Sequence, residues 1–269
     1  MSISIIDSNG VERFLGNIDP TASQKYSWRV FGDTPDQIMI PRSAWKQYIT
    51  AFGNGFENRC LTPIHDQDGI GMCNASATAA AIEMMRSQIG LPYVSLSGGD
   101  LYRRICGSRD QGSMLEDGIR EAMANGVAET SVVPYLDWRG APAGWKESAK
   151  KHMVLEASLC PTFDHVGSAL LHGYPVIMGM MWSNNDNVDG DGWLPASSGG
   201  GGGGHALCSY WLAERNGKFG AVTRNSWKES WGRNGICVIP ESRFGRQVTG
   251  NWAVRVVSQA DSDMPAPQE

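Results

Sequence analysis

The stretch Gln67-Asp68-Gly69-Ile70-Gly71-Met72-Cys73-Asn74 decides how the rest of the chain is interpreted. It runs into residues 75–86, which are rich in helix formers and contain no Gly or Pro, so the sequence predicts a helix that begins at Cys73 and continues to Ile89. Free N–H groups at a helix start stabilise an anion, so we expect a lowered pKa for the Cys73 thiol. Gln67, six residues earlier across a glycine-containing loop, is placed to donate to a developing oxyanion. The stretch therefore predicts a nucleophile with an electrophilic partner.

A cysteine nucleophile needs a base and a group that orients the base, and two later segments supply candidates. His205 precedes an apolar, strand-like segment, and Asn225 opens the run Asn225-Ser226-Trp227. His205 lies 132 positions after Cys73, and Asn225 lies 20 positions after His205. With these residues in this order, the chain resembles the papain family of cysteine peptidases.

The resemblance implies a role for each matching residue. Cys73 matches the nucleophile, His205 the general base and acid, Asn225 the group that orients the imidazole, and Gln67 the oxyanion-hole residue; as a pair, Cys73 and His205 are expected to form a thiolate and an imidazolium. Trp227 matches an indole that shields the Asn–His hydrogen bond, and we group it with the residues around bound peptide.

Gly112 and Ser113 fall where the family has a Gly-Gly pair that runs alongside bound peptide. The similarity extends over residues 40–257, with two departures near the nucleophile. Ile70 replaces one family half-cystine and Asp110 stands in place of its disulfide partner, so no bridge is expected there. Asn74 follows the nucleophile where the family has Trp, which changes the wall of the cleft on that side.

The order of predicted elements indicates an α+β protein. Helices are predicted over 73–89, 98–105 and 114–124, and the later part of the chain, from residue 150 on, is rich in strands. This order, together with the resemblance, predicts a papain-like two-lobed fold. An N-terminal helical lobe of about residues 60–140 contains the central helix, a C-terminal β-barrel-like lobe covers about 145–257, and the active-site cleft lies between them.

Three further segments complete the predicted organisation. Residues 1–45 form an N-terminal arm, too short and too rich in turn formers for the family's inhibitory prosegment; they are either an extra strand packed on the catalytic domain of 46–257 or a docking segment for a larger assembly. Residues 184–204 end in six consecutive glycines and predict a flexible loop, or alternatively a lid beside His205. Residues 258–269 are predicted to be a disordered tail.

The composition limits which class of protein this chain belongs to and which kinds of partner we expect for it. The chain is 41% hydrophobic and 19% charged, and its net charge of −5 argues against a nucleic-acid partner. No apolar run approaches the length of a membrane helix, and no secretory signal is seen, so we expect a cytoplasmic or virion-associated protein without a membrane partner.

No metal or other cofactor is expected. There is no Cys-x-x-Cys motif, and His205 and Cys208 would make a zinc site only by consuming the base. Asp186, Asp189 and Asp191 slightly resemble a calcium loop but lack the required Glu. The six cysteines are expected to be free thiols in a reducing compartment.

Three functions remain open at this stage. The first is a thiol-dependent endopeptidase that acts on peptide or protein substrates. The second is a catalytically weak papain-like component of a bacterial or phage assembly, docked through the N-terminal arm. The third is a hydrolase of peptidoglycan stem peptides.

Overall fold

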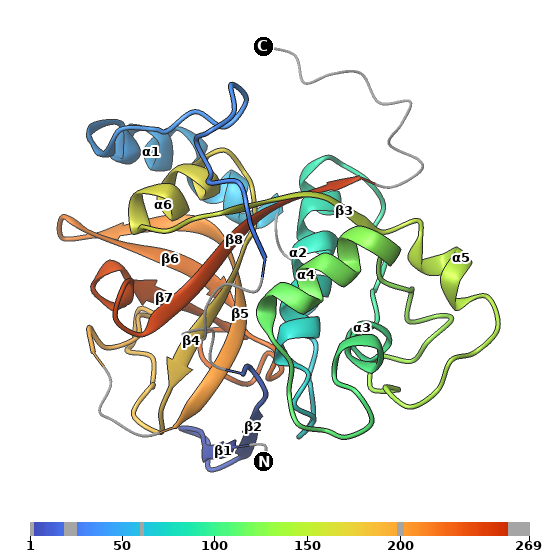
Figure 1. Ribbon diagram of the computed structural model, residues 1–269. Helices are drawn as coiled ribbons and strands as arrows, with labels where there is room; N and C mark the ends of the chain where they lie inside the picture. The colour runs from blue at the N-terminus through green and yellow to red at the C-terminus, as the bar shows by residue number, and fades with distance from the viewer. Residues whose placement is uncertain (1–2, 19–25, 60–61, 198–201, 258–269) are drawn as a thin grey trace.

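The computed structural model describes residues 3–18, 26–59, 62–197 and 202–257, which form helices, one large sheet and a separate hairpin (Figure 1). The helices are α1 (Arg42–Arg59), α2 (Cys73–Gln88), α3 (Gly98–Ile105), α4 (Leu115–Asn125), α5 (Trp145–Ala149), α6 (Phe163–Leu171) and the short 3-10 helix η1 (Glu241–Arg243). The strands are β1 (Ile3–Ile6), β2 (Glu12–Leu15), β3 (Met153–Leu159), β4 (Val176–Trp182), β5 (Gly203–Arg215), β6 (Lys218–Arg224), β7 (Ile236–Pro240) and β8 (Val248–Val257). None of the described helices is both long and apolar enough to cross a membrane.

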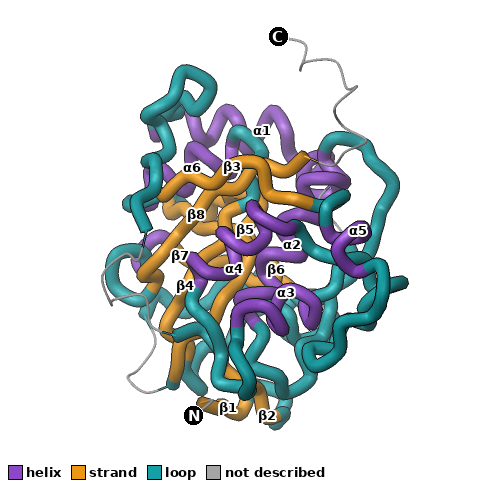
Figure 2. The backbone as a smooth tube through the Cα atoms, turned by 45° about the vertical axis from the view of Figure 1, so that its right-hand side comes forward, coloured by secondary structure: helices purple, strands orange, loops and turns teal. Residues whose placement is uncertain are grey.

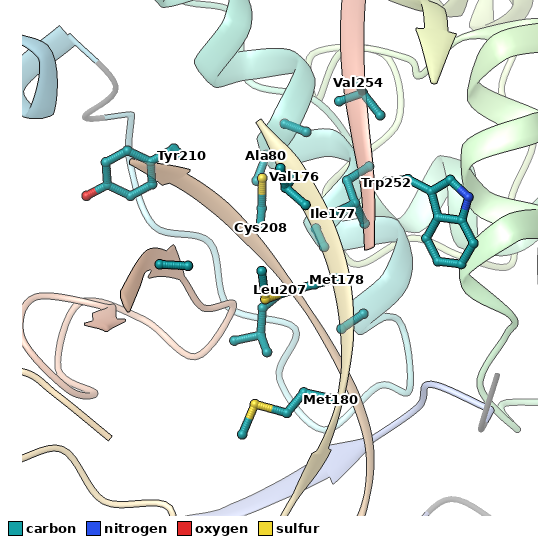
Figure 3. Packing of buried hydrophobic residues seen from close by; sticks show 14 of the residues in the cluster. Ala80, Val176, Ile177, Met178, Met180, Leu207, Cys208, Tyr210, Trp252 and Val254 are labelled. Atoms are coloured by element: carbon teal, nitrogen blue, oxygen red, sulfur yellow. The ribbon is translucent and has the colours of Figure 1, made fainter. Parts of the chain in front are cut away.

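Helix α2 is the buried centre of the fold, as its sequence predicts. It begins at Cys73, and its first ten residues are all buried, because small alanines let the neighbouring elements approach closely. It packs against β5 on one side and against α3 and α4 on the other. In Figure 3, Ala80 of α2 lies near Val176 of β4 and Cys208 of β5. The nucleophile candidate is therefore fixed to the most buried helix of the molecule.

The large sheet has the strand order β3-β8-β4-β5-β6-β7, and each neighbouring pair is antiparallel. Among the described residues it is an open sheet that ends at β3 and β7, so the lobe is rich in sheet, as predicted, without closing into a barrel. Strand β5 begins at Gly203, so the last two glycines of the 199–204 run belong to a strand and not to a loop. Residues 198–201 lie outside the described part, and so does the predicted tail of 258–269.

The helices and the sheet form the two predicted lobes, with details that the sequence did not indicate. Figures 1 and 2 show α3 and α4 beside α2, and α4 also packs against β3 at the edge of the large sheet. Helix α1 contacts α6 and β5, and its Trp45 packs edge-on against Phe163 of α6 and Phe219 of β6. The fold is the predicted α+β arrangement, and α1 and α6 cover the sheet-rich lobe.

The N-terminal arm contains a hairpin that packs on both lobes. Strands β1 and β2 pair antiparallel, with Ile3 opposite Leu15, and Gly10 takes a positive φ of 75° in the turn between them. Ile5 and Leu15 point into the core. The next element, α1, begins at Arg42, a few residues before the domain boundary drawn at residue 45.

Candidate active site

Cys73 is the first residue of α2 and is completely buried. Burial raises the pKa of its thiol to about 11, although backbone N–H groups of Ala206, Gly16, Asn74 and Cys73 itself point at the sulfur and act in the opposite direction. The lowered pKa that the helix start predicts is therefore wrong for this form of the protein, because loss of water around the sulfur outweighs the helix amides. The Ala206 contact places the sulfur beside the peptide unit that follows His205.

His205 lies at the start of β5, and its ring is bonded to Asn225. The distance between Nε2 of His205 and Oδ1 of Asn225 is 2.8 Å, and both residues are buried. Nδ1 of the same ring has no hydrogen-bond partner among the described residues. Burial lowers the pKa of His205 to about 4, although the hydrogen bond that its Nε2 donates to Asn225 acts in the opposite direction. Both pKa shifts favour an uncharged ring and an uncharged thiol at neutral pH, in the direction opposite to the predicted thiolate–imidazolium pair.

A group of tryptophans surrounds the imidazole. Trp227 stacks on His205 with 4.6 Å between ring centroids, and Trp182 meets the same ring edge-on at 5.4 Å. Trp231 packs edge-on against Trp227. Trp227 is fully buried, and its indole covers one face of the His205 ring beside the bond to Asn225. Trp182 was missed in the sequence, where it reads only as the end of an apolar strand.

Gln67 is held where it can bind a peptide oxygen. Its Nε2 donates to the carbonyl of Phe14 at 2.9 Å and to the carbonyl of Ile70 at 2.8 Å. Its Oε1 accepts a hydrogen bond from the hydroxyl of Ser226 at 2.6 Å, and its backbone N–H donates to the Ser226 carbonyl. The loop before Cys73 is therefore joined to the residue that follows Asn225, and this fixes the side-chain amide.

Ser113 pairs with the backbone of the N-terminal arm, and Gly112 lies close against Gly16 of the same arm. Ser113 N donates to the carbonyl of Gly16 at 2.8 Å, and Ile18 N donates to the carbonyl of Ser113 at 3.0 Å. Asn17 lies between these two and its N–H donates to the carbonyl of Gly204 at 2.9 Å. The arm thus bonds to Ser113 of the helical lobe and to Gly204 of β5 in the sheet-rich lobe.

Asp110 links the nucleophile loop to the peptide-binding wall. Its Oδ1 accepts from Gly71 N at 3.0 Å and from the hydroxyl of Tyr102 at 2.6 Å, and that hydroxyl accepts from Gly112 N at 2.9 Å. Burial and this carboxylate raise the pKa of Tyr102. Hydrogen bonds therefore connect the two segments in which the sequence lacks the family's cysteine pair. Neither Tyr102 nor this role of Asp110 was predicted.

Asn74, the departure next to the nucleophile, joins the same wall. Its Nδ2 donates to the hydroxyl of Ser113 at 3.2 Å and to the carbonyl of Met114. Gly118 in α4 leaves room for it, because a Cβ there would lie 2.6 Å from Oδ1 of Asn74. The small polar residue thus holds the peptide-binding loop against the start of α2.

Other candidate groups take structural positions. Asp186 pairs with Arg243, and Asp189 and Asp191 pair with Arg215, so the aspartates that resemble a calcium loop are bound to arginines. No group of three or more His, Cys, Asp or Glu suited to a metal occurs in the part of the chain that was searched, the described residues. Five cysteines are buried free thiols, and the sixth, Cys60, lies outside the described residues: Cys73, Cys106, Cys160, Cys208 and Cys237.

The comparisons with known proteins agree with this geometry. The family model described as papain family cysteine protease matches residues 54–247. Among solved structures, the chain is similar to xylellain, a cysteine protease from Xylella fastidiosa, at 20% identity and a TM-score of 0.66, covering 95% of this chain and 98% of that one. It is also similar to procathepsin B S9 from Trypanosoma congolense, at 16% identity and a TM-score of 0.67, over 91% and 87% of the two chains.

A third similar structure is the bromelain protease from Ananas comosus in complex with the E64 inhibitor, at 18% identity and a TM-score of 0.60, covering 78% of this chain and 96% of that one. No curated protein sequence matches. The family match covers well over half of the chain and contains the cysteine, the histidine and the asparagine in the expected order. The chain belongs to the papain family of cysteine proteases.

Proposed function

We propose that this chain is an endopeptidase in which Cys73, His205 and Asn225 act as a catalytic triad and Gln67 completes the oxyanion hole. The observation that carries the proposal is the state of the His205 ring. Its Nε2 is bonded to Asn225, and its buried Nδ1 has no partner among the described residues. The next residue in the chain, Ala206, directs its backbone N–H toward the Cys73 sulfur. An imidazole held by one nitrogen, with the other left to exchange a proton, is what a thiol nucleophile requires.

The reaction is an acyl transfer in two stages. His205 takes the thiol proton, the sulfur of Cys73 bonds to the carbonyl carbon of the substrate, and the carbonyl oxygen becomes negative between the amide of Gln67 and the N–H of Cys73. His205 then gives the proton to the leaving nitrogen as the C–N bond breaks. A water molecule, deprotonated by His205, attacks the thioester, and the C–S bond breaks to restore the thiol.

Two further contacts favour a peptide substrate. Gln67 already donates to a peptide carbonyl, that of Phe14, so its amide is presented to this kind of acceptor. Ser113 pairs with an extended backbone through both its N–H and its carbonyl, a mode of binding that depends little on side chains. The intact ring geometry favours an enzyme over an inert component of an assembly. Zymography on wall material beside a peptide library separates a peptidoglycan stem hydrolase from a general endopeptidase.

A peptide-library cleavage profile with matched variants tests the proposal. Cys73→Ala is expected to abolish cleavage, and Asn225→Ala is expected to lower kcat by about 10- to 100-fold, because the ring loses its fixed orientation. Cys237→Ala, which removes another buried thiol, serves as the control and is expected to keep activity. Cleavage that survives in Cys73→Ala would contradict the proposal.

A further inference from the structure

A cavity of about 750 Å³ lies between α4, the edge strand β3 and the segment of residues 27–36. Its apolar walls come from Met123 and Ala124 of α4, from Leu155 of β3, and from Trp28. The indole Nε1 of Trp28 is buried and has no hydrogen-bond partner among the described residues, so one donor is unused here. None of the candidate active-site residues lines this cavity. The cavity is therefore a second place on the protein where a ligand fits.

The edge of β3 beside this cavity has backbone groups that can pair with a further strand. At the end of β3, Leu159 N donates to the carbonyl of Arg29 at 2.7 Å, so this edge already binds one extended segment. Ala157 presents its N–H and carbonyl to the same edge, because backbone groups alternate in direction along a strand. Its partner on β8, Val254, accordingly donates to the carbonyl of Pro175, away from β3. No backbone group of a described residue pairs with Ala157 at this edge.

The charged groups of the cavity include two arginines that lack a carboxylate partner. Asp36 and Glu156, the carboxylates that line the cavity, both pair with Arg255, at 3.7 Å and 3.1 Å. Arg29 and Arg120 also line the cavity and are exposed, and neither forms an ion pair with a described residue. A guanidinium group binds a carboxylate through two parallel hydrogen bonds. The charges therefore favour a ligand that carries a carboxylate.

We propose that this cavity binds an extended acidic peptide segment of a partner protein, which adds to β3 as a further strand at Ala157. Pairing with the strand edge binds the backbone of the peptide whatever its sequence, and the cavity selects the side chains. Neighbouring side chains of a strand point to opposite faces, so apolar and acidic residues that alternate fit the apolar walls and the free arginines together. A small apolar carboxylate would use the arginines and leave the edge of β3 unpaired. The inference does not depend on the proposed function.

The first test measures binding of a fluorescein-labelled octapeptide of alternating valine and glutamate by fluorescence anisotropy. Every protein is the full chain with Cys73→Ala, so that cleavage cannot remove the peptide. Arg120→Ala and Arg29→Ala are each expected to weaken binding about tenfold, because a charge-assisted contact is lost. Arg246→Ala, which removes an exposed arginine outside the cavity, is the matched control and is expected to leave the affinity unchanged. Circular dichroism checks that each variant is folded.

The second test follows hydrogen exchange of the Ala157 amide by NMR. The acidic peptide is expected to slow this exchange, and an octapeptide of alternating valine and lysine is expected to leave it unchanged. Equal affinity of the acidic peptide for the Arg120→Ala, Arg29→Ala and Arg246→Ala proteins would overturn the inference, and so would unchanged exchange at Ala157 with the acidic peptide bound. Dodecanoate binding that Arg120→Ala weakens, without binding of the acidic peptide, would also overturn it and would identify a site for a small apolar carboxylate.

Discussion

The imidazole of His205 lies nearly flat against the indole of Trp227, with 4.6 Å between the ring centroids and 25° between the ring planes. The indole covers one face of the imidazole beside the hydrogen bond to Asn225, and Trp182 meets the imidazole edge-on. Water therefore cannot compete for Asn225, and the ring keeps one orientation while Nδ1 remains available.

Removal of this indole tests how much the arrangement depends on it. We expect Trp227→Ala to lower the free energy of unfolding by about 3–5 kcal/mol, because a fully buried aromatic ring is lost and a cavity forms beside His205. Trp227→Phe keeps a ring on the imidazole and should lose less. Urea unfolding followed by circular dichroism gives both values. Trp145→Ala, at a half-buried position, is the control, and an equal loss there would contradict the prediction.

The buried imidazole should make stability depend on pH. The pKa of His205 is lowered from 6.5 to about 4, so between these values the unfolded chain binds a proton at this residue and the folded chain does not. The contribution of His205 to the free energy of unfolding is therefore fully present above pH 6.5. It is lost as the pH falls toward 4, by up to about 3 kcal/mol at 1.36 kcal/mol per pH unit. His205→Gln removes this contribution.

The measurement is urea unfolding of both proteins at several pH values between 7 and 4. We expect the advantage of wild type over His205→Gln to shrink across this range. Curves that stay parallel for the two proteins would show that the ring is not buried in its neutral form.

The hydrogen bonds of Asp110 should stabilise the loop before the nucleophile. Asp110→Ala leaves Gly71 N and the hydroxyl of Tyr102 without this acceptor, at a cost of about 1–3 kcal/mol in unfolding free energy, and should also lower kcat. Asp110→Asn keeps one oxygen and should be milder. Thermal unfolding and peptide cleavage are the measurements. Asp164→Ala, which breaks a surface ion pair with Arg42, is the control and should change stability by less than about 1 kcal/mol.

A second buried pair is expected to matter for folding and not for catalysis. Arg243 and Asp186 are 2.6 Å apart, with both side chains fully buried, and Asp186 also accepts from Ser183 N at 2.8 Å. Asp186→Ala leaves the arginine buried without its partner and should cost about 3–5 kcal/mol. Asp191→Ala, in an exposed pair with Arg215, should cost less than about 1 kcal/mol. Denaturant midpoints of the two variants that coincide would contradict this.

Much of the fold could be predicted because local signals and tertiary packing agree. The alanine-rich run after Cys73 favours a helix and also suits a crowded centre, so the start of α2 was predicted correctly. The turn at Asn216-Gly217, where both residues have positive φ, joins β5 and β6 in a hairpin that brings His205 and Asn225 together. These features depend on residues close in sequence.

The surroundings of His205 depend on contacts that the sequence pattern does not indicate. Strand β6 ends at Arg224, so Asn225 and Trp227 lie in the segment that follows it. There Asn225 N donates to the carbonyl of Gly235, and Trp227 forms a bridge with Asp66 in the loop before Cys73. Segments distant in the sequence therefore help to position both residues beside the imidazole.

The ionisation of Cys73 was predicted wrongly for a related reason. The helix start is a local feature and favours a thiolate, but the residues that cover the sulfur come from the arm and from β5. Gly16 reads as an ordinary turn former, and only the backbone atoms that surround it in space show why no side chain fits there. A short sequence pattern does not indicate where distant segments of the chain approach each other closely.

The link that Asp110 makes to Gly71 consists of hydrogen bonds, and the cysteines of the described residues are free thiols. Where a disulfide stabilises a papain-family active site, a reducing buffer has two opposing effects, because the nucleophile must stay reduced while the disulfide must stay oxidised. In this protein hydrogen bonds hold the loop beside Cys73, so a reducing agent does not weaken it. Dithiothreitol can therefore be added at the concentration that best protects the nucleophile without loosening that loop.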